Sequence, residues 1–417
     1  MNYFQIENDA IIAGLFLILL AGLFYSADSN RVFWKKLYGV IPPLLFCYLI
    51  PGFLNSYHII DGETSGLYRF ATNYLLPASL ILLLSTANLK AIFGLGNKAL
   101  ILFFTGSIGI VIGGPIALYI VSSLSASFQV AAQEAGYWKG LVTITGSGIG
   151  GSSSQLALKE IYGCSEELFV IILVIDALVA NVWTALLFYG AGISQKIDAW
   201  LGADATLIEE VKKNILKYKE SKDKPAEVKD LTFILGIGFG GTAVAHALSG
   251  FISSYFIPHK DWLISHGLEP FASQFLWLIL LSTTIGILLS FTRIREMEKL
   301  GSTDFATLFI YFLIMTIGMR LDLFTIGANI GLIGVAVIWM LIHITAMIVA
   351  AKIIKAPFFF VAVGSQANIG GVATAPAVAA AFHPSLAPVG VLLAVLSHVI
   401  GTYAGIISAW LMRLVDV

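Results

Sequence analysis

The chain has 417 residues, of which 58% are hydrophobic and 12% are charged, with a net charge of −1 and a mean hydropathy of +0.88. Soluble domains average about 25% charged residues, so the composition excludes a soluble protein and indicates an integral membrane protein. The near-neutral charge argues against nucleic acid as a partner, and two cysteines, Cys47 and Cys164, make neither a disulfide framework nor a metal cluster. We expect no cofactor, and no metal other than Na⁺ as a candidate.

Twelve apolar segments approach the length of about 20 residues that a membrane-spanning helix needs. They are residues 9–27, 38–55, 70–88, 99–123, 138–160, 168–192, 231–256, 272–292, 305–319, 329–351, 357–381 and 389–412. The first has no Lys or Arg before it, unlike a signal peptide, and is predicted to be a retained span. The sequence therefore predicts an all-α polytopic membrane protein with about 12 (11–13) transmembrane helices, in the inner (plasma) membrane of a bacterium.

A charged stretch, 193–230, separates a first transmembrane half, 1–192, from a second, 231–417. It holds eight lysines and eight acidic residues. Apolar side chains recur in it at helical spacing, at Leu207, Val211, Leu216 and Tyr218. This pattern predicts an exposed amphipathic helix followed by a flexible tail, either as a solvated linker or as a regulatory or partner site.

Two glycine-rich stretches interrupt the fifth and eleventh segments. Thr145-Gly-Ser-Gly-Ile-Gly-Gly-Ser-Ser-Ser-Gln155 and Gly364-Ser-Gln-Ala-Asn-Ile-Gly-Gly-Val-Ala-Thr-Ala-Pro376 share Gly-Ser and an Ile-Gly-Gly whose copies lie 220 residues apart. Non-helical backbone survives inside a membrane only where it is buried in protein or lines a cavity. Paired interruptions in two halves point to a transporter's binding site. We therefore predict two structural repeats with two crossing discontinuous helices.

Lysine and arginine in short loops mark the cytoplasmic side of a membrane protein. The basic residues are Arg31, Lys35, Lys36, Lys90 and Lys98 in the first half, and Arg293, Arg295, Lys299, Lys352, Lys355 and Arg413 in the second. They place the N-terminus outside, the fifth segment running inward and the eleventh outward, so the halves are inverted. The segment count contradicts this, since two segments six apart run parallel. We therefore expect that one membrane crossing is miscounted, and we place the miscount within residues 190–270.

Asp176 is the only carboxylate deep in an apolar segment, where a charge costs about 2.5–3.5 kcal/mol on insertion scales. It either couples ions or protons, or it is a structural residue bonded to the broken backbone of the fifth segment. Neutral oxygens beside one carboxylate suit a cation such as Na⁺. The predicted ion-binding or coupling residues are Asp176, Asn181, Thr145, Ser147, Asn368, Ser397 and His398.

The two breaks also offer helix N-termini to an anionic substrate. The predicted substrate-binding residues are Gly150, Gly151, Ser152, Ser153, Ser154, Gln155, Ser365, Gln366, Gly370, Gly371 and Thr374. The alternative is that glycine and serine only permit close helix packing. We assign that packing role to Gly109-x-x-x-Gly113 and Gly236-x-x-x-Gly240, and structural roles to His246 and His343.

The chain resembles the YjcL-like family of membrane proteins, within the superfamily of cation:proton antiporters, bile-acid sodium symporters and glutamate:sodium symporters. The residues that carry the resemblance are Gly148-Ile-Gly-Gly-Ser152, Asp176, Ala367-Asn-Ile-Gly-Gly371 with Thr374, Asn88-Leu-Lys90 and Arg320-Leu-Asp322. It covers most of the chain except the linker and the extreme N-terminus. It implies an elevator-type carrier with a scaffold domain, a core domain and a homodimer formed through the scaffold.

Two departures from the family pattern leave ion and substrate open. Ala177 stands where relatives commonly have Asn, and Ser153, Ser154 and Gln155 fill a region where an Asn usually follows the first Gly-Gly.

We predict an ion-coupled (Na⁺ or H⁺) secondary transporter of a small organic anion or amino-acid-like solute, working by alternating access. A cation/proton antiporter with no organic substrate is the alternative, and a channel is a third. An enzyme is not expected, although Ser152 and His246 faintly resemble the dyad of a rhomboid-like intramembrane serine protease. Two Gly-x-Gly-x-x-Gly matches, at 146–151 and 236–241, lie in apolar segments and do not indicate a dinucleotide site.

Overall fold

The computed structural model describes residues 5–40, 43–203, 208, 227–266, 268–321 and 330–415. In this part of the chain the regular structure is helical, apart from one isolated bridge between Ile6 and Ile60. The amphipathic helix predicted within the linker lies outside the described residues.

Every predicted apolar segment coincides with a helix or with consecutive helices. These are α1 (Asp9–Ala27), α3 (Pro43–Ser56), α4 with η1 and α5 (Leu67–Phe70, Ala71–Leu75, Leu76–Ser85), α7 (Asn97–Leu124), α9 (Tyr137–Tyr162), α10 (Glu166–Gly192), α13 (Val228–Phe256), α15 (Gln274–Ser290), α16 (Ser302–Gly318), α17 (Ile330–Ile354), α18 with α19 (Phe358–Ile369, Gly371–Phe382) and α20 (Ala387–Val415). Shorter connecting helices include α2 (Val32–Val40), α6 (Leu89–Phe93), α8 (Ala126–Ala135), α11 (Ser194–Leu201), α14 (Lys260–Ser265), η3 (Ile257–His259), η4 (Glu269–Ala272), η5 (Arg293–Leu300) and η6 (Pro384–Leu386).

Within the described residues, seven helices are long and apolar enough to cross a membrane, or up to eight if α15 and η5 count as one bent span. The predicted segments that do not meet this test are α3, α9, α16 and the α18–α19 pair, which are short or interrupted by polar residues. The prediction of an all-α polytopic membrane protein is confirmed.

Both glycine stretches break their helices, as predicted. After each break the chain does not continue across the membrane in the same direction. Gly151 in α9 has φ +66° and ψ −167°, and Gly371 at the start of α19 has φ +56°. The rings of Trp138 and Tyr162, 24 residues apart, lie 5.6 Å from each other, and those of Phe358 and Phe382 lie 6.1 Å apart. A continuous helix would separate such residues by about 36 Å. Each segment therefore doubles back as a hairpin, and the prediction of two crossing helices is wrong.

Close packing of the two limbs explains why these hairpins need glycine. A Cβ added to Gly146 would lie 2.8 Å from the Cα of Gln155 in the returning limb. A Cβ on Gly370 would lie 1.8 Å from Thr374 Oγ1 and 2.2 Å from Gln366 Nε2. We call α9 the first hairpin and α18–α19 the second hairpin.

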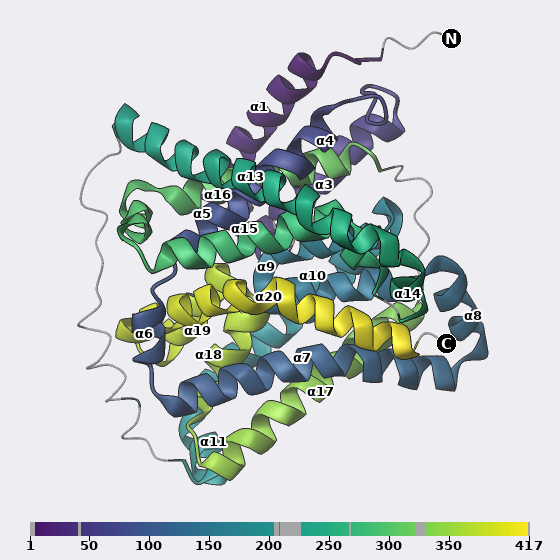
Figure 1. Ribbon diagram of the computed structural model, residues 1–417. Coiled ribbons are helices and arrows are strands. Elements are labelled where there is room, and N and C mark those ends of the chain that lie inside the picture. The colour runs from purple at the N-terminus through teal and green to yellow at the C-terminus, as the bar shows by residue number, and fades with distance from the viewer. Residues whose placement is uncertain are drawn as a thin grey trace.

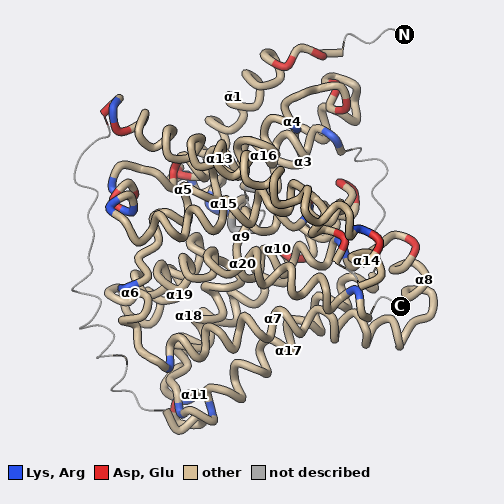
Figure 2. Tube along the Cα trace, in the orientation of Figure 1, with Lys and Arg blue, Asp and Glu red and all other residues tan. Residues whose placement is uncertain are grey.

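The two hairpins open toward opposite ends of the molecule. The second hairpin opens beside α11, where the backbone N–H of Phe358 donates to Asp198 Oδ1 at 2.7 Å. The first hairpin opens where α20 ends, because the Arg413 guanidinium lies over the Trp138 ring, 5.4 Å from its centroid. We call the former the basic end, because Lys352 lies there over the Trp200 ring of α11, Lys98 Nζ donates to the Lys355 carbonyl, and Lys90 lies in α6. Figure 2 shows basic residues beside α6 and α11 at this end, and we call the opposite end the outer end.

Removing the two hairpins from the count of crossings resolves the conflict in the sequence. Five segments remain in each half, namely α1, α3, α4–α5, α7 and α10, then α13, α15, α16, α17 and α20. An odd number of crossings makes the second half inverted relative to the first, as the basic loops predicted. The miscount lies in the two broken segments and not in 190–270. The assignment of Arg413 to the cytoplasmic residues is wrong, because Arg413 lies at the outer end.

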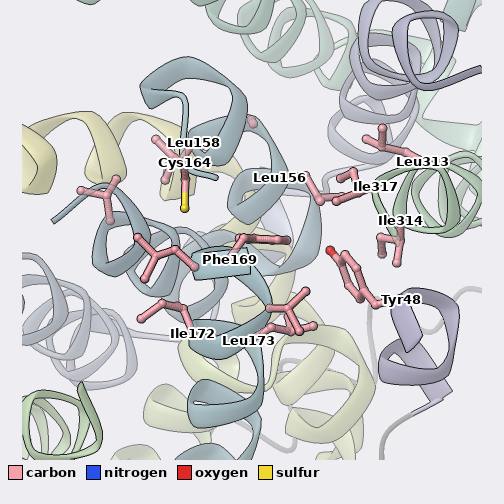
Figure 3. Packing of buried hydrophobic residues seen from close by; sticks show 14 of the residues in the cluster. Tyr48, Leu156, Leu158, Cys164, Phe169, Ile172, Leu173, Leu313, Ile314 and Ile317 are labelled. Atoms are coloured by element: carbon pink, nitrogen blue, oxygen red, sulfur yellow. The ribbon is translucent and has the colours of Figure 1, made fainter. Parts of the chain in front are cut away.

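The helices form two bodies, one above the other in Figure 1. The core holds α7, α10, α17, α20 and both hairpins, and the scaffold holds α1, α3, α4–α5, α13, α15 and α16. Apolar side chains line their boundary near the outer end (Figure 3), where Tyr48 of α3 meets Phe169 of α10 with ring centroids 5.7 Å apart. Leu156 of the first hairpin extends toward Ile317 of α16.

The two Gly-x-x-x-Gly motifs differ in what they contact. A Cβ on Gly109 would lie 3.2 Å from the Cα of His343, and one on Gly113 would lie 2.7 Å from the Trp339 ring, so the packing role is confirmed there. Among the described residues nothing lies within 4 Å of a Cβ on Gly236 or Gly240, so the predicted packing is not found there between helices of this part of the chain.

We expect Gly113→Ala to lower the melting temperature of the purified protein by several degrees, because overpacking costs about 1–3 kcal/mol. Gly236→Ala is the matched control and should leave the melting temperature unchanged or raise it, since alanine is the better helix former by about 1 kcal/mol. Equal effects of the two substitutions would contradict the packing of α7 against α17.

Candidate ion and substrate site

The two hairpin tips converge on His398 in the middle of α20. A Cβ added to Gly151 would lie 3.0 Å from His398 Nε2, and one added to Gly371 would lie 3.8 Å from its Cε1. His398 Nδ1 lies 2.7 Å from the carbonyl oxygen of Ala394. A carbonyl cannot donate, so Nδ1 carries the hydrogen, and Nε2 is the free ring nitrogen that faces the tip of the first hairpin.

A cavity of about 490 Å³ at the basic end leads to this histidine. It lies between the scaffold and the core, and its polar lining comes from Thr86, Asn88, Glu298, Thr303 and His398. Val372, directly after the tip of the second hairpin, also lines it. The cavity therefore joins the basic end of the molecule to the hairpin tips.

Asp176 lies in α10 and does not line the cavity that leads to His398. Its Oδ2 accepts a hydrogen bond of 2.6 Å from Ser147 Oγ in the first hairpin. Asp176 faces a cavity of about 40 Å³ whose other lining residues are apolar, apart from His343 and Trp339. This volume exceeds the 10–15 Å³ or so that one water needs. No lysine or arginine lines the cavity, so a carboxylate charge here must be neutralised by a proton or a bound cation.

His343 lies within a chain of hydrogen bonds that runs from Trp183 through Ser365 to the Gly106 carbonyl. Its Nδ1 donates to the carbonyl of Gly106 at 2.9 Å, so its Nε2 accepts from Ser365 Oγ at 2.8 Å. Ser365 in turn accepts from Trp183 Nε1 at 2.8 Å. Both ring nitrogens are used, so His343 braces α17 against α7 and the second hairpin, which is the structural role predicted for it.

Asn368 also forms hydrogen bonds that hold the second hairpin to its neighbours. Its amide nitrogen donates to the carbonyls of Phe103 at 3.2 Å and Gly364 at 3.0 Å, and its oxygen accepts from Ser107 at 2.9 Å. The residue fixes the second hairpin to α7. Its side-chain oxygen is buried, and Ser107 uses one of its two lone pairs.

Most other predicted polar residues bind helices to each other. Gln366 Nε2 donates to Thr374 Oγ1 at 2.6 Å, across the limbs of the second hairpin, and to Thr184 Oγ1 of α10 at 2.9 Å. Thr145 donates to Ser408 at 3.0 Å, and Ser154 lies 3.2 Å from Thr402, so the first hairpin is held to α20.

The remaining predicted residues are distributed as follows. Ser153 and Ser397 bond to backbone carbonyls one turn earlier, at Gly150 and Ala394. Ser152 is half-buried at the first tip, and Gln155 is buried with no hydrogen-bond partner for its Nε2 among the described residues. Asn181 is exposed and lines neither cavity. Gly150 packs on Gly401, since a Cβ on either would lie within 2.9 Å of the other's Cα.

The structure therefore divides the predicted site in two. Asp176 and Ser147 form one locus, and His398 with Gly151 and Gly371 forms the other. No pattern in the sequence singles out Ser107, Thr184, Thr402 or Ser408, because small polar residues are common in membrane helices.

A cluster of charged residues at the outer end joins the two bodies and was not predicted. Tyr68 of the scaffold donates to Glu160 of the first hairpin at 2.5 Å. Arg320, after α16 of the scaffold, pairs with Glu166 of α10 at 3.0 Å. Lys159 lies between them, 2.8 Å from Glu160 and 3.5 Å from Glu166, with only 2% of its side chain exposed. We call these five residues the outer cluster.

His246 has a different partner from the one a protease needs. Its Nε2 lies 2.8 Å from the carbonyl oxygen of Asn73, in the π-helical turn η1 of the scaffold. Such a turn leaves backbone carbonyls in need of a donor. The structural role predicted for His246 accounts for this bond, whereas Ser152 lies in the core at a hairpin tip.

Exchange of Gly151 for alanine tests the tip geometry. The backbone of Gly151 lies in a region open essentially only to glycine, so Ala there costs about 1–3 kcal/mol and also contacts His398. Gly163→Ala is the control, because Gly163 has φ +60° with nothing within 4 Å. We expect both variants to lose thermal stability, but only Gly151→Ala to lose ligand-induced stabilisation. A ligand response retained in Gly151→Ala would contradict a site at the tips.

An inverted pair of five-helix repeats, each with one re-entrant hairpin whose tip reaches the centre, defines a polytopic integral membrane protein built around a central polar site. The chain matches the family described as "Protein of unknown function (DUF819)" over residues 14–414, and it belongs to that family. It is 28% identical over 350 residues to "Uncharacterized membrane protein YjcL" of Bacillus subtilis (strain 168), and the alignment covers 82% of each chain. The predicted resemblance to YjcL-like proteins is confirmed at the level of the family.

Proposed function

We propose that the protein is an ion-coupled secondary transporter that works by alternating access. The observation that carries this proposal is that two hairpins inserted from opposite ends converge on His398. His398 also lines the cavity that begins at the basic end. Inverted repeats with a central site are the architecture in which one body moves against the other and exposes the site to each side of the membrane in turn. Placement in the superfamily of cation:proton antiporters and sodium symporters is part of the proposal.

The difference between the two ends supports alternating access. At the basic end a cavity of about 490 Å³ separates scaffold from core. At the outer end the two bodies are joined by the outer cluster, by Arg413 of α20 paired with Glu269, and by the apolar boundary of Figure 3. These features are those of an inward-open state, if the basic end is cytoplasmic.

The size of the larger cavity favours an organic substrate over an antiporter that carries only ions. A volume of about 490 Å³ falls in the range of small-molecule sites, about 300–1,000 Å³. Its lining of hydroxyl, amide, imidazole, carboxylate and apolar groups suits an amino-acid-like solute better than a small organic anion, because the charged side chain in it, Glu298, is acidic. An N–H or O–H of such a solute can donate a hydrogen bond to His398 Nε2. The antiporter remains the second candidate because Asp176 lies in a separate cavity.

The composition of the smaller cavity favours a proton as the coupling ion. Hard cations in proteins take about six oxygen ligands or more, and the lining side chains that carry oxygen reduce to Asp176, with Ser147 bonded to it. Sodium coupling would require further backbone carbonyls or water. We further propose that the protein is not an enzyme, acts in a bacterial plasma membrane and forms a homodimer through its scaffold.

Reconstitution into liposomes tests the proposal. With an imposed pH or Na⁺ gradient, we expect uptake of one member of a panel of amino acids and carboxylates, and exchange of labelled for unlabelled solute without a gradient. A channel would pass current and show no such exchange. Ion flux with no solute uptake would establish the antiporter, and absence of flux and exchange across a broad panel would overturn the proposal.

A further inference from the structure

Three cationic side chains line a third cavity, which lies at the basic end and is distinct from the cavities at His398 and Asp176. The cavity measures about 220 Å³, and Lys90, Arg293 and Arg295 line it together with Thr292 and Glu296. Lys90 belongs to α6 of the first repeat, whereas both arginines belong to η5 of the second. Two segments some 200 residues apart thus place three positive charges and one negative charge around one space.

None of the three cations has an ion-pair partner among the described residues. This contrasts with the outer end, where Lys159, Arg320 and Arg413 are all paired. A basic loop in water needs no partner, but here the charges converge on a cavity, and the lining has a net charge of about +2 from three cations and one acid. The cavity is therefore suited to an anion.

The surroundings of the cavity indicate which anion. Phe291, which lines it, is 68% exposed, and Phe93 at the end of α6 is 65% exposed. Exposed phenylalanine side chains at the ends of membrane helices are suited to contact with acyl chains, and lysine and arginine beside them reach the headgroups. Basic pockets on the cytoplasmic side of membrane helices bind anionic lipid headgroups. Figure 2 shows basic residues beside α6 at this end of the molecule.

We infer that this cavity, which we call the α6–η5 pocket, binds the phosphate of an anionic phospholipid headgroup. A lipid bound there would also affect the transport cycle, and this effect rests on the proposed function. α6 connects α5 of the scaffold to α7 of the core and packs on α20, whereas η5 belongs to the scaffold. A lipid held by Lys90 and Arg293 together would tether this connector to the scaffold and favour the state seen here.

Binding is tested without any transport assay, by titrating phosphatidylglycerol or phosphatidylcholine into the purified protein in a neutral detergent and following the melting temperature. Ligands that bind only the folded state raise it. We expect phosphatidylglycerol to raise the melting temperature by about 2–4 °C at ten times its dissociation constant, and phosphatidylcholine to have no effect. In Arg293→Gln/Arg295→Gln the lipid should bind about thirtyfold more weakly, because each basic residue contributes about a factor of five.

Lys35→Gln/Lys36→Gln is the matched control, since it removes the same charge from exposed positions of α2 that do not line the pocket. Arg293→Lys/Arg295→Lys keeps the charge and should keep most of the response. An equal loss in the control would overturn the inference, because the effect would then come from net charge. Full stabilisation by millimolar inorganic phosphate, with nothing added by the lipid, would assign the pocket to a free anion and overturn the lipid assignment.

Discussion

Asp176→Asn protein is expected to be more stable than the wild type and inactive in coupled transport. Asn keeps an acceptor for Ser147 at the same position but removes a charge that has no cationic partner in its cavity. Since a carboxylate within a membrane helix costs about 2.5–3.5 kcal/mol on insertion scales, we expect the melting temperature to rise by about 2–5 °C. Solute uptake driven by a pH or Na⁺ gradient should fall to background.

The separate readouts distinguish a coupling residue from a structural one. If Asp176 served only to hold the first hairpin, Asn would preserve both uptake and its response to the gradient. We expect instead that solute exchange without a gradient persists while gradient-driven accumulation is lost. Asn181→Ala, in the same helix but exposed, is the control and should behave as the wild type. Loss of stability together with retained coupling would remove Asp176 from the proposed mechanism.

The sequence predicted the positions of the breaks because glycine, hydroxyl and amide residues are conspicuous in apolar segments. Gly151 and Gly371 do have the backbone conformations that only glycine adopts readily. That the limbs double back could not be predicted, since it depends on contacts such as Trp138 with Tyr162, which no local pattern encodes. The conflict between charge pattern and segment count was the available signal, because a hairpin uses one apolar segment without adding a crossing.

The same limit applies to the candidate site. Asp176 could be selected because it is a lone carboxylate in an apolar helix, and His398 because it occupies roughly the place in the twelfth segment that Asp176 has in the sixth. Asn368 was predicted to bind an ion and Gln366 to bind substrate, yet their amides bond to Ser107 and Thr374. Lysine near a helix end usually extends to the interface, but Lys159 is buried beside two glutamates, and only the meeting of helices far apart in sequence reveals this.

Tyr68→Phe is expected to shift the protein away from the inward-open state. The Tyr68 hydroxyl donates to Glu160 at 2.5 Å and so joins scaffold to core at the outer end. Hydrogen bonds to charged groups contribute about 1.5–3 kcal/mol, so their loss changes the ratio of the two states roughly ten- to hundredfold. Arg320→Gln should act in the same direction but more weakly, because Arg320 is 37% exposed and such pairs contribute at most about 1 kcal/mol.

Hydrogen exchange measures this shift at both ends of the molecule. We expect faster exchange in residues 66–70 and 159–166, which surround the outer cluster. We expect slower exchange in residues 86–91 and 298–303, because the cavity at the basic end closes. A variant that is merely less stable would exchange faster at both ends and melt earlier. Arg69→Gln, which removes an exposed charge beside Tyr68 without touching the cluster, should show neither change. Opposite responses at the two ends require the bodies to move against each other, because local loosening at the outer end has no means of protecting the basic end.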